Sequence, residues 1–227
     1  MKKVAIFDID GSIFRSSLVI EITNALVDEG YFPKSTKKFY HQALEKWLNR
    51  QDSYEKYINA VVQAFGKNIK GVRQKDFSDL ARRIISRDKN RVYRFSRDLV
   101  KQLKKKNYYL LAISHSPKEI VQEFAHSFGF DKAYGRILET NKQGIFTGRV
   151  LYADLIDDKA KILKRAVSHN NLTLRGSVGV GDTESDIPFL RLVSKPICFN
   201  PNKKLYTRAK KAGWEIVLER KDVIYKI

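Results

Sequence analysis

The sequence predicts an α/β protein with a doubly wound parallel sheet and an inserted helical unit. Four short apolar runs each stop at a polar residue, namely Asp8, Ser114, Asp182 and Asn200. Continuous apolar runs of this length are typical of strands that are buried on both faces. Helical patterns separate the runs, and this alternation favours a sheet whose ligands bind where the strands end. The four polar residues are therefore expected to lie along one crevice.

Helical patterns follow the second and third of these runs. After Ser114, the sequence "SPKEIVQEFAHSFG" offers Ser116 as the N-cap, Pro117 at the first helical position and Gly129 as the stop. The segment 159–170, "KAKILKRAVSHN", repeats apolar residues at helical spacing. Between them, glycines and alternating apolar residues over 139–150 predict a short hairpin or flap.

The first two runs are separated by about a hundred residues, whereas a plain crossover needs only about a dozen. Apolar residues recur every third or fourth position through this interval, so we interpret residues 15–88 as a helical cap domain. Residues 1–14 and 89–227 then form the α/β core. The cap is rich in aromatic residues, which are expected to fill its interior: Phe39, Tyr40, Trp47, Tyr54 and Tyr57.

Composition limits the classes of protein that the chain can belong to. The 227 residues are 43% hydrophobic, which is enough for a packed core, and the single cysteine, Cys198, excludes an intrachain disulfide. The apolar run behind Lys2 and Lys3 stops at Asp8, too early for a signal peptide or a membrane span, so we expect a cytoplasmic protein. The formal charge of +19 suits a phosphorylated substrate, a nucleic acid or an anionic membrane surface.

Paired carboxylates predict a metal site at the crevice. Asp8 and Asp10 project to the same side of an extended chain, beside Gly11, where the backbone can turn sharply. Asp182 and Asp186 follow another strand end and can complete a site for Mg²⁺, which binds carboxylates together with phosphate oxygens.

Two further residues are candidates for binding phosphate. Ser114 precedes a helix, and Lys159 begins the next one. Taken singly, each has an ordinary structural explanation, as a helix cap and as a solvated surface lysine. Their order relative to the aspartates is what gives them functional weight.

In this order the motifs resemble those of the haloacid dehalogenase superfamily, in its phosphoserine phosphatase-like subfamily IB. "FDIDGS" is similar to the first motif, Ser114 to the second, Lys159 to the third and "GDTESD" to the fourth. The insertion lies where that subfamily carries its C1-type cap. The resemblance covers nearly the whole chain and implies the family's Rossmannoid core.

The resemblance also implies a mechanism with an aspartyl-phosphate intermediate on Asp8, and with Asp10 as general acid and base. It implies Mg²⁺ held by Asp8, the backbone carbonyl of Asp10 and Asp182, with Asp186 in support. It implies Ser114 and Lys159 as phosphate ligands. His115 adjoins them and is a further candidate for the phosphate site or for contact with the leaving group, with packing or solvent exposure as the alternative.

Departures from the family pattern bear on the substrate. Ser17 stands where phosphoserine phosphatases commonly carry glutamate, and His115 and Ser116 stand where they carry two glycines. Ser185 replaces their asparagine. These departures count against phosphoserine as the substrate but leave the phosphoryl chemistry unchanged. We therefore expect a Mg²⁺-dependent phosphatase that acts on a small phosphorylated metabolite or lipid headgroup.

Two alternatives remain beside the phosphatase. One is a phosphotransferase that passes the phosphoryl group to an acceptor alcohol. The other is a nucleic-acid-associated basic protein, including a polynucleotide end phosphatase, which rests on the net charge alone because the sequence contains no nucleic-acid-binding motif.

Overall fold

The computed structural model describes all 227 residues and contains one eight-stranded sheet in the order β4-β3-β2-β1-β5-β6-β7-β8. The six inner strands run parallel, and the edge strands β4 and β8 pair antiparallel to their neighbours. The strands are β1 (Lys2–Asp8), β2 (Tyr109–Pro117), β3 (Lys132–Thr140), β4 (Phe146–Leu151), β5 (Leu172–Gly181), β6 (Lys195–Phe199), β7 (Glu215–Arg220) and β8 (Val223–Lys226). The predicted doubly wound α/β fold is confirmed.

The strand order reverses on either side of β1, which lies between β2 and β5. Successive strands add outward from β1 through β2 and β3 on one side, and through β5, β6 and β7 on the other. The register pairs Asp8 with Ile113 and Phe7 with Val180, so β1, β2 and β5 end side by side. This reversal produces a crevice at the carboxyl ends of these strands.

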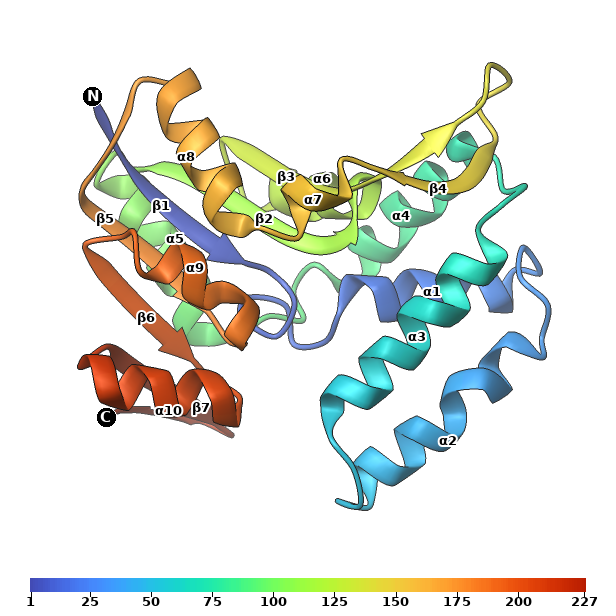
Figure 1. Ribbon diagram of the computed structural model, residues 1–227, viewed down its shortest axis with the longest axis horizontal. Coiled ribbons are helices and arrows are strands. Elements are labelled where there is room, and N and C mark those ends of the chain that lie inside the picture. The colour runs from blue at the N-terminus through green and yellow to red at the C-terminus, as the bar shows by residue number, and fades with distance from the viewer.

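Helices cover both faces of the sheet (Figure 1). Along β1, Ala5 and Phe7 face one hydrophobic cluster, while Val4 and Ile6 face another that includes residues of α8, α9 and α10. The core helices are α5 (Arg94–Lys105), α6 (Lys118–Ser127), α7 (Ala153–Ile156), α8 (Lys159–His169), α9 (Ile187–Leu190) and α10 (Lys203–Ala212), with a short 3₁₀ turn at Glu184–Asp186. No helix in the protein has both the length and the apolar character needed to cross a membrane.

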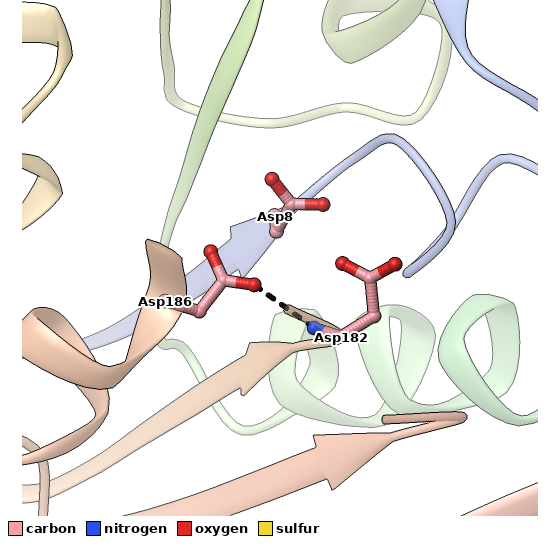
Figure 2. Close-up of side chains that lie close together, drawn as sticks. All are labelled: Asp8, Asp182 and Asp186. Atoms are coloured by element: carbon pink, nitrogen blue, oxygen red, sulfur yellow. Dashed lines mark hydrogen bonds between the residues drawn. The ribbon is translucent and has the colours of Figure 1, made fainter. Parts of the chain in front are cut away.

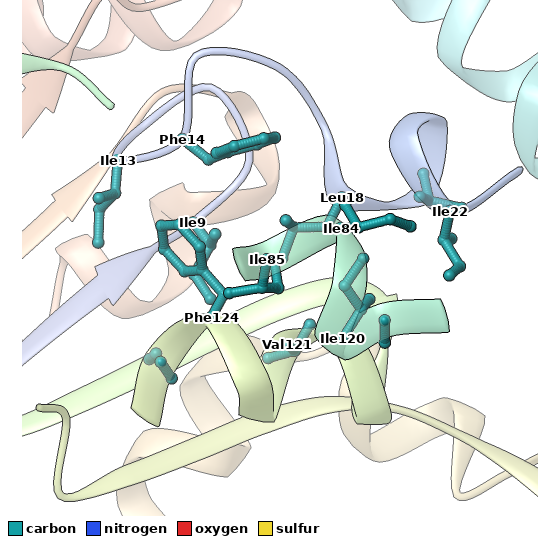
Figure 3. Packing of buried hydrophobic residues seen from close by; sticks show 14 of the residues in the cluster. Ile9, Ile13, Phe14, Leu18, Ile22, Ile84, Ile85, Ile120, Val121 and Phe124 are labelled. Atoms are coloured by element: carbon teal, nitrogen blue, oxygen red, sulfur yellow. The ribbon is translucent and has the colours of Figure 1, made fainter. Parts of the chain in front are cut away.

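The interval between β1 and β2 contains four helices that we call the cap helices. They are α1 (Leu18–Asp28), α2 (Thr36–Leu48), α3 (Tyr54–Asn68) and α4 (Gln74–Asp88). Residues of α1 and α4 pack with α6 in the largest hydrophobic cluster, as Figure 3 shows for Leu18, Ile85 and Phe124. Helices α2 and α3 instead contribute most of a separate cluster of five buried residues. We propose residues 15–88 as the cap domain; its first and last helices are anchored on the core.

Two details differ from the sequence-based expectations. On α2, Phe39 is 52% exposed and lies under the ammonium group of Lys67, whereas Tyr40 is buried and donates a hydrogen bond to Asn24. The other is Ser116, which belongs to β2 and is not the N-cap of α6, because Pro117 still pairs with Arg136 of β3. The hairpin predicted over 139–150 is present as the antiparallel pair β3 and β4.

Candidate active site

Three aspartates converge at the carboxyl ends of β1 and β5. Asp8 is the last residue of β1, Asp182 follows β5, and Asp186 closes the short turn after it. Each offers a carboxylate oxygen, and these oxygens lie within 4.8 Å of one another (Figure 2). The predicted meeting of the first and fourth motifs therefore occurs in the structure.

Two glycines allow this close approach. Gly11 has a φ of +80°, and a side chain there would overlap the carboxylate of Asp182. A side chain at Gly181 would overlap Asp186. Asp186 in turn accepts hydrogen bonds from the backbone N–H groups of Asp182 and Thr183, at 2.9 and 3.0 Å. The loop is thus folded around the Asp186 carboxylate.

Lys159 lies within this cluster. Its Nζ is 2.6 Å from Asp8 Oδ1 and 2.6 Å from Asp186 Oδ1, and the side chain is 2% exposed. Lys159 is the first residue of α8, and Asp158 caps that helix by accepting from the N–H groups of Ala160 and Lys161. Lys159 is therefore not a solvated surface lysine, because its ammonium group is buried between two carboxylates.

The cluster has more negative than positive charge. Burial raises the pKa of Asp8 to about 8, with Lys159 opposing the shift and Asp186 and Asp10 adding to it. Burial also raises the pKa of Asp182, and the neighbouring Asp8 and Asp186 raise it further. Burial alone would lower the pKa of Lys159, but Asp186 and Asp8 outweigh it and raise that pKa above its usual value. One ammonium group does not offset three carboxylates.

The residues present fit a hard divalent cation. Asp8 Oδ2 is buried and has no hydrogen-bond partner, although its sister oxygen is held by Lys159. An orphaned buried carboxylate oxygen beside two further carboxylates is a donor set typical of Mg²⁺ sites. A cation bound there would satisfy this oxygen and offset the excess negative charge.

Asp10 lies outside this group of three and makes different contacts. Its Oδ1 accepts from the backbone N–H of Leu18 at 2.6 Å, at the start of α1. Its Oδ2 accepts from the hydroxyls of Ser114 and of Ser116, the latter at 3.0 Å. Ser116 also accepts from the N–H of Val19 at 3.1 Å. Asp10 and Ser116 thus join the end of β2 to the first cap helix.

Two of the predicted phosphate ligands, Ser114 and His115, have side chains that point to different parts of the molecule. Ser114 is fully buried, and its hydroxyl is bonded to Asp10. The imidazole of His115 is instead directed to α7, where Nε2 lies 3.1 Å from the carbonyl oxygen of Ile156. Since a carbonyl only accepts, this nitrogen carries the proton. Burial lowers the pKa of His115 to about 4, and the positive charges of Lys159 and Arg136 add to the effect.

The structure adds two residues, Ser116 and Tyr54, that the sequence did not assign to the site. Ser116, expected as a helix cap, holds Asp10. Tyr54, expected in the cap interior, is 38% exposed, and its pKa is raised by burial and by the carboxylates of Asp10 and Asp182. No local pattern marks either residue, because each acts through an element far away in the sequence.

The start of α3 is tied to the Asp182 loop through the core helix α10. Glu55 Oε2 lies 3.8 Å from Lys204 Nζ, which lies 2.6 Å from Glu184 Oε1. Asn202, the N-cap of α10, donates from its backbone N–H to the carbonyl of Asp182 at 2.8 Å. These contacts place Tyr54 and Glu55 on the cap side of the aspartate cluster.

Similarity to known proteins agrees with this geometry. The family model for haloacid dehalogenase-like hydrolases matches residues 5–191. A histidinol-phosphatase of Neisseria meningitidis serogroup C is 27% identical over 226 residues, covering 96% of this chain and 99% of the relative. The phosphoserine phosphatase SerB1 of Mycobacterium tuberculosis is 25% identical and covers 93% of this chain and 69% of its own.

Solved structures share the fold. A Bordetella pertussis protein of unknown function superposes with a TM-score of 0.74 at 16% identity, covering 95% of this chain and 98% of that one. A substrate-bound phosphoserine phosphatase superposes with a TM-score of 0.63 at 20% identity, covering 98% of this chain and 95% of that one. The resemblance to the phosphoserine phosphatase-like branch is confirmed, and with it the expectation of a phosphoric monoester hydrolase. The chain belongs to the haloacid dehalogenase-like hydrolase family.

Proposed function

We propose that the protein is a Mg²⁺-dependent phosphatase that hydrolyses a small phosphomonoester through an aspartyl-phosphate on Asp8. The supporting observation is the state of the Asp8 carboxylate. One oxygen is held by Lys159, while the other is buried, unpartnered and close to Asp182 and Asp186. A carboxylate oriented in this way at the mouth of a strand-end crevice suits a nucleophile.

In the proposed first step, Asp8 attacks phosphorus, and the bond between phosphorus and the leaving-group oxygen breaks. Asp8 must be ionised to attack, which Lys159 favours from 2.6 Å. Asp8 and Asp182, with the backbone carbonyl of Asp10, would hold Mg²⁺, which supplies positive charge between the anionic carboxylate and the anionic phosphate. Asp186 positions Lys159 and the backbone of the loop.

Asp10 moves the protons in this proposal. It gives a proton to the departing alkoxide, and in the second step it takes a proton from the water that attacks the aspartyl-phosphate. The second step releases phosphate and restores Asp8. Hydrogen bonds from Leu18 N–H and from the hydroxyl of Ser116 orient the Asp10 carboxylate for both transfers.

Phosphate oxygens would meet Lys159 and the backbone at the end of β2. Ser114 joins them in the proposal when its hydroxyl turns from Asp10 to the phosphate. Burial and then the carboxylates of Asp10 and Asp182 raise the pKa of Tyr54, and on this ground we place the leaving group toward that residue. A ring-bearing leaving group fits an aromatic side chain there, and the name of the Neisseria relative makes histidinol phosphate the first substrate to test.

The testing experiment is a phosphate-release screen over phosphomonoesters with Mg²⁺, using Asp8→Asn as the blank. We expect Asp8→Asn to lower turnover by at least about 1,000-fold while the circular dichroism spectrum stays unchanged. Asp154→Asn, an exposed aspartate on α7, is the matched control and should retain full activity. Normal turnover by Asp8→Asn would overturn the mechanism.

The same assay separates hydrolysis from phosphotransfer. With added glycerol or ethanol, a hydrolase releases all phosphate as inorganic phosphate, whereas a phosphotransferase gives a new phosphomonoester. We expect hydrolysis to predominate at every alcohol concentration. Phosphoryl capture that grows with alcohol concentration would assign the alternative reaction.

A further inference from the structure

A second pocket lies at the opposite end of the sheet from the aspartate cluster. Its volume is about 570 Å³, and we call it the amino-edge pocket because it borders the start of β6 and the end of α10. Both of these ends lie at the left of Figure 1, away from the arrowhead of β1. The pocket is of a size that accommodates small-molecule ligands. It is lined by Leu190, Arg191, Val193, Ser194, Lys195, Pro196, Arg208, Gly213, Trp214 and Glu215.

Positive charge predominates in this lining. Arg191, Lys195 and Arg208 are opposed by one acidic residue, Glu215, which is already paired with Lys195 at 3.1 Å. The two arginines form no salt bridge. The carbonyl end of α10 also borders the pocket, and its partial negative charge would repel an anion. Lys210 and Lys211, in the last turn of α10, offset this negative charge.

Arg208 is the more informative of the two arginines. Its Nε is buried without a hydrogen-bond partner, and it is one of only three such side-chain atoms in the protein. The guanidinium lies over the indole of Trp214, 5.5 Å from the ring centroid, which fixes its direction. Asp8 Oδ2, another of the three, is at the proposed metal site. The terminal N–H groups of this oriented guanidinium are not buried and bond to no residue of the protein, so they are the groups that can meet an anion in the pocket.

We propose that the amino-edge pocket binds a small oxyanion, with a phosphate or carboxylate group held by Arg208 and Arg191. Guanidinium groups match the geometry of such oxyanions with paired N–H donors. The site is separate from the proposed catalytic site, so the protein would hold two phosphate-binding positions, one at each end of the sheet. Binding of such an anion would give part of the net charge of +19 a role that does not require a nucleic acid.

Trp214 makes the proposal measurable, since the protein has only two tryptophans and the other, Trp47, can be replaced by phenylalanine. The protein for the test carries Trp47→Phe and Asp8→Asn, which leaves Trp214 as the fluorescent reporter and removes turnover. The probes are inorganic phosphate and citrate, each titrated against sodium chloride at equal ionic strength. We expect a saturable change in Trp214 emission with phosphate, citrate or both, and none with chloride.

Arg208→Gln is the decisive variant, and it should weaken this binding by at least about tenfold. Lys203→Gln removes the same charge from the first residue of the same helix, at the end away from the pocket, and should leave the binding unchanged. If Arg208→Gln does not fold, Arg191→Gln provides the same comparison. Equal effects of the arginine and lysine variants, or no saturation with either probe, would overturn the proposal. Neither result would affect the proposed catalysis, which this experiment does not measure.

Discussion

The two sides of the candidate active site are built differently. On the core side, Asp8, Lys159 and Asp186 are almost wholly buried, and Lys159 donates a hydrogen bond of 2.6 Å to each of the two carboxylates. On the cap side, Tyr54 is 38% exposed, and the ion pair between its neighbour Glu55 and Lys204 of α10 spans 3.8 Å. The groups that we propose to react are buried and hydrogen-bonded, whereas the residues that we place around the leaving group are partly exposed.

Packing explains this difference. The core side is supported by the 34-residue cluster in which α1, α4 and α6 meet the sheet, whereas α2 and α3 are packed mainly around a cluster of five buried residues. Fewer buried contacts allow lower-energy local motions. We expect substitutions on the core side to affect stability and turnover together, and substitutions on the cap side to affect substrate preference.

Removing the buried ammonium group of Lys159 should have the largest effect on stability. Lys159→Met leaves the carboxylates of Asp8 and Asp186 uncompensated and should lower the free energy of unfolding by about 3–5 kcal/mol in metal-free buffer at pH 7. Chemical denaturation measures this loss, and added Mg²⁺ should recover part of it. Lys161→Met, an exposed neighbour on the same helix, should change stability by less than about 0.5 kcal/mol. Equal stabilities of the two variants would contradict the core-side model.

Ser116 connects the two sides, and its loss should have an intermediate effect. Ser116→Ala removes one hydrogen bond to Asp10 and leaves the buried N–H of Val19 without its acceptor, at a cost of about 1–3 kcal/mol. Turnover should fall about tenfold because Asp10 is less well oriented. Thermal unfolding and phosphate release test both effects, with Ser168→Ala as the control. A change in stability without a change in turnover would limit Ser116 to a structural role.

Tyr54 tests the cap side directly. Tyr54→Leu should raise KM about 2- to 10-fold for p-nitrophenyl phosphate, whose leaving group is a ring, and leave KM for phosphoethanolamine unchanged. The melting temperature should fall by about 2–6 °C, because the Tyr54 ring also packs against Trp47 and Tyr57. Tyr31→Leu is the matched control, since Tyr31 is 39% exposed and lies in the α1–α2 connection. An equal rise in KM for both substrates would remove Tyr54 from leaving-group selection.

We expect the smallest effect from replacing His115, and it should appear as a change in how stability depends on pH. The pKa of His115 is lowered from 6.5 to about 4 in the folded protein, so the unfolded chain binds more protons between these values. Its contribution to stability is therefore complete above pH 6.5 and is lost as the pH falls toward 4. His115→Gln should reduce the acid destabilisation in this window, whereas His126→Gln, at an exposed position, should not. Denaturation midpoints at pH 7, 5.5 and 4.5 would show the difference.

Local sequence determined the strands that are buried on both faces and the charged residues at their ends. β1, β2, β5 and β6 are continuous apolar runs, so they could be identified without any tertiary contact. The start of α8 at Lys159 was predicted as well, from apolar residues that recur at helical spacing over 159–170. The polar residues at these termini then predicted the crevice.

Only the tertiary structure decided which distant groups meet there. Ser116 joins Asp10 and α1 because β2 continues past the position where a cap was predicted. The start of α3 lies near the Asp182 loop because Lys204 of α10 pairs with both Glu55 and Glu184. The partly exposed strands β3, β7 and β8 also lack a continuous apolar run. Local sequence patterns indicate which residues are buried and which backbone conformation each segment prefers. The unpartnered atoms of Asp8 and Arg208, by contrast, result from contacts between segments far apart in sequence, which no local pattern encodes.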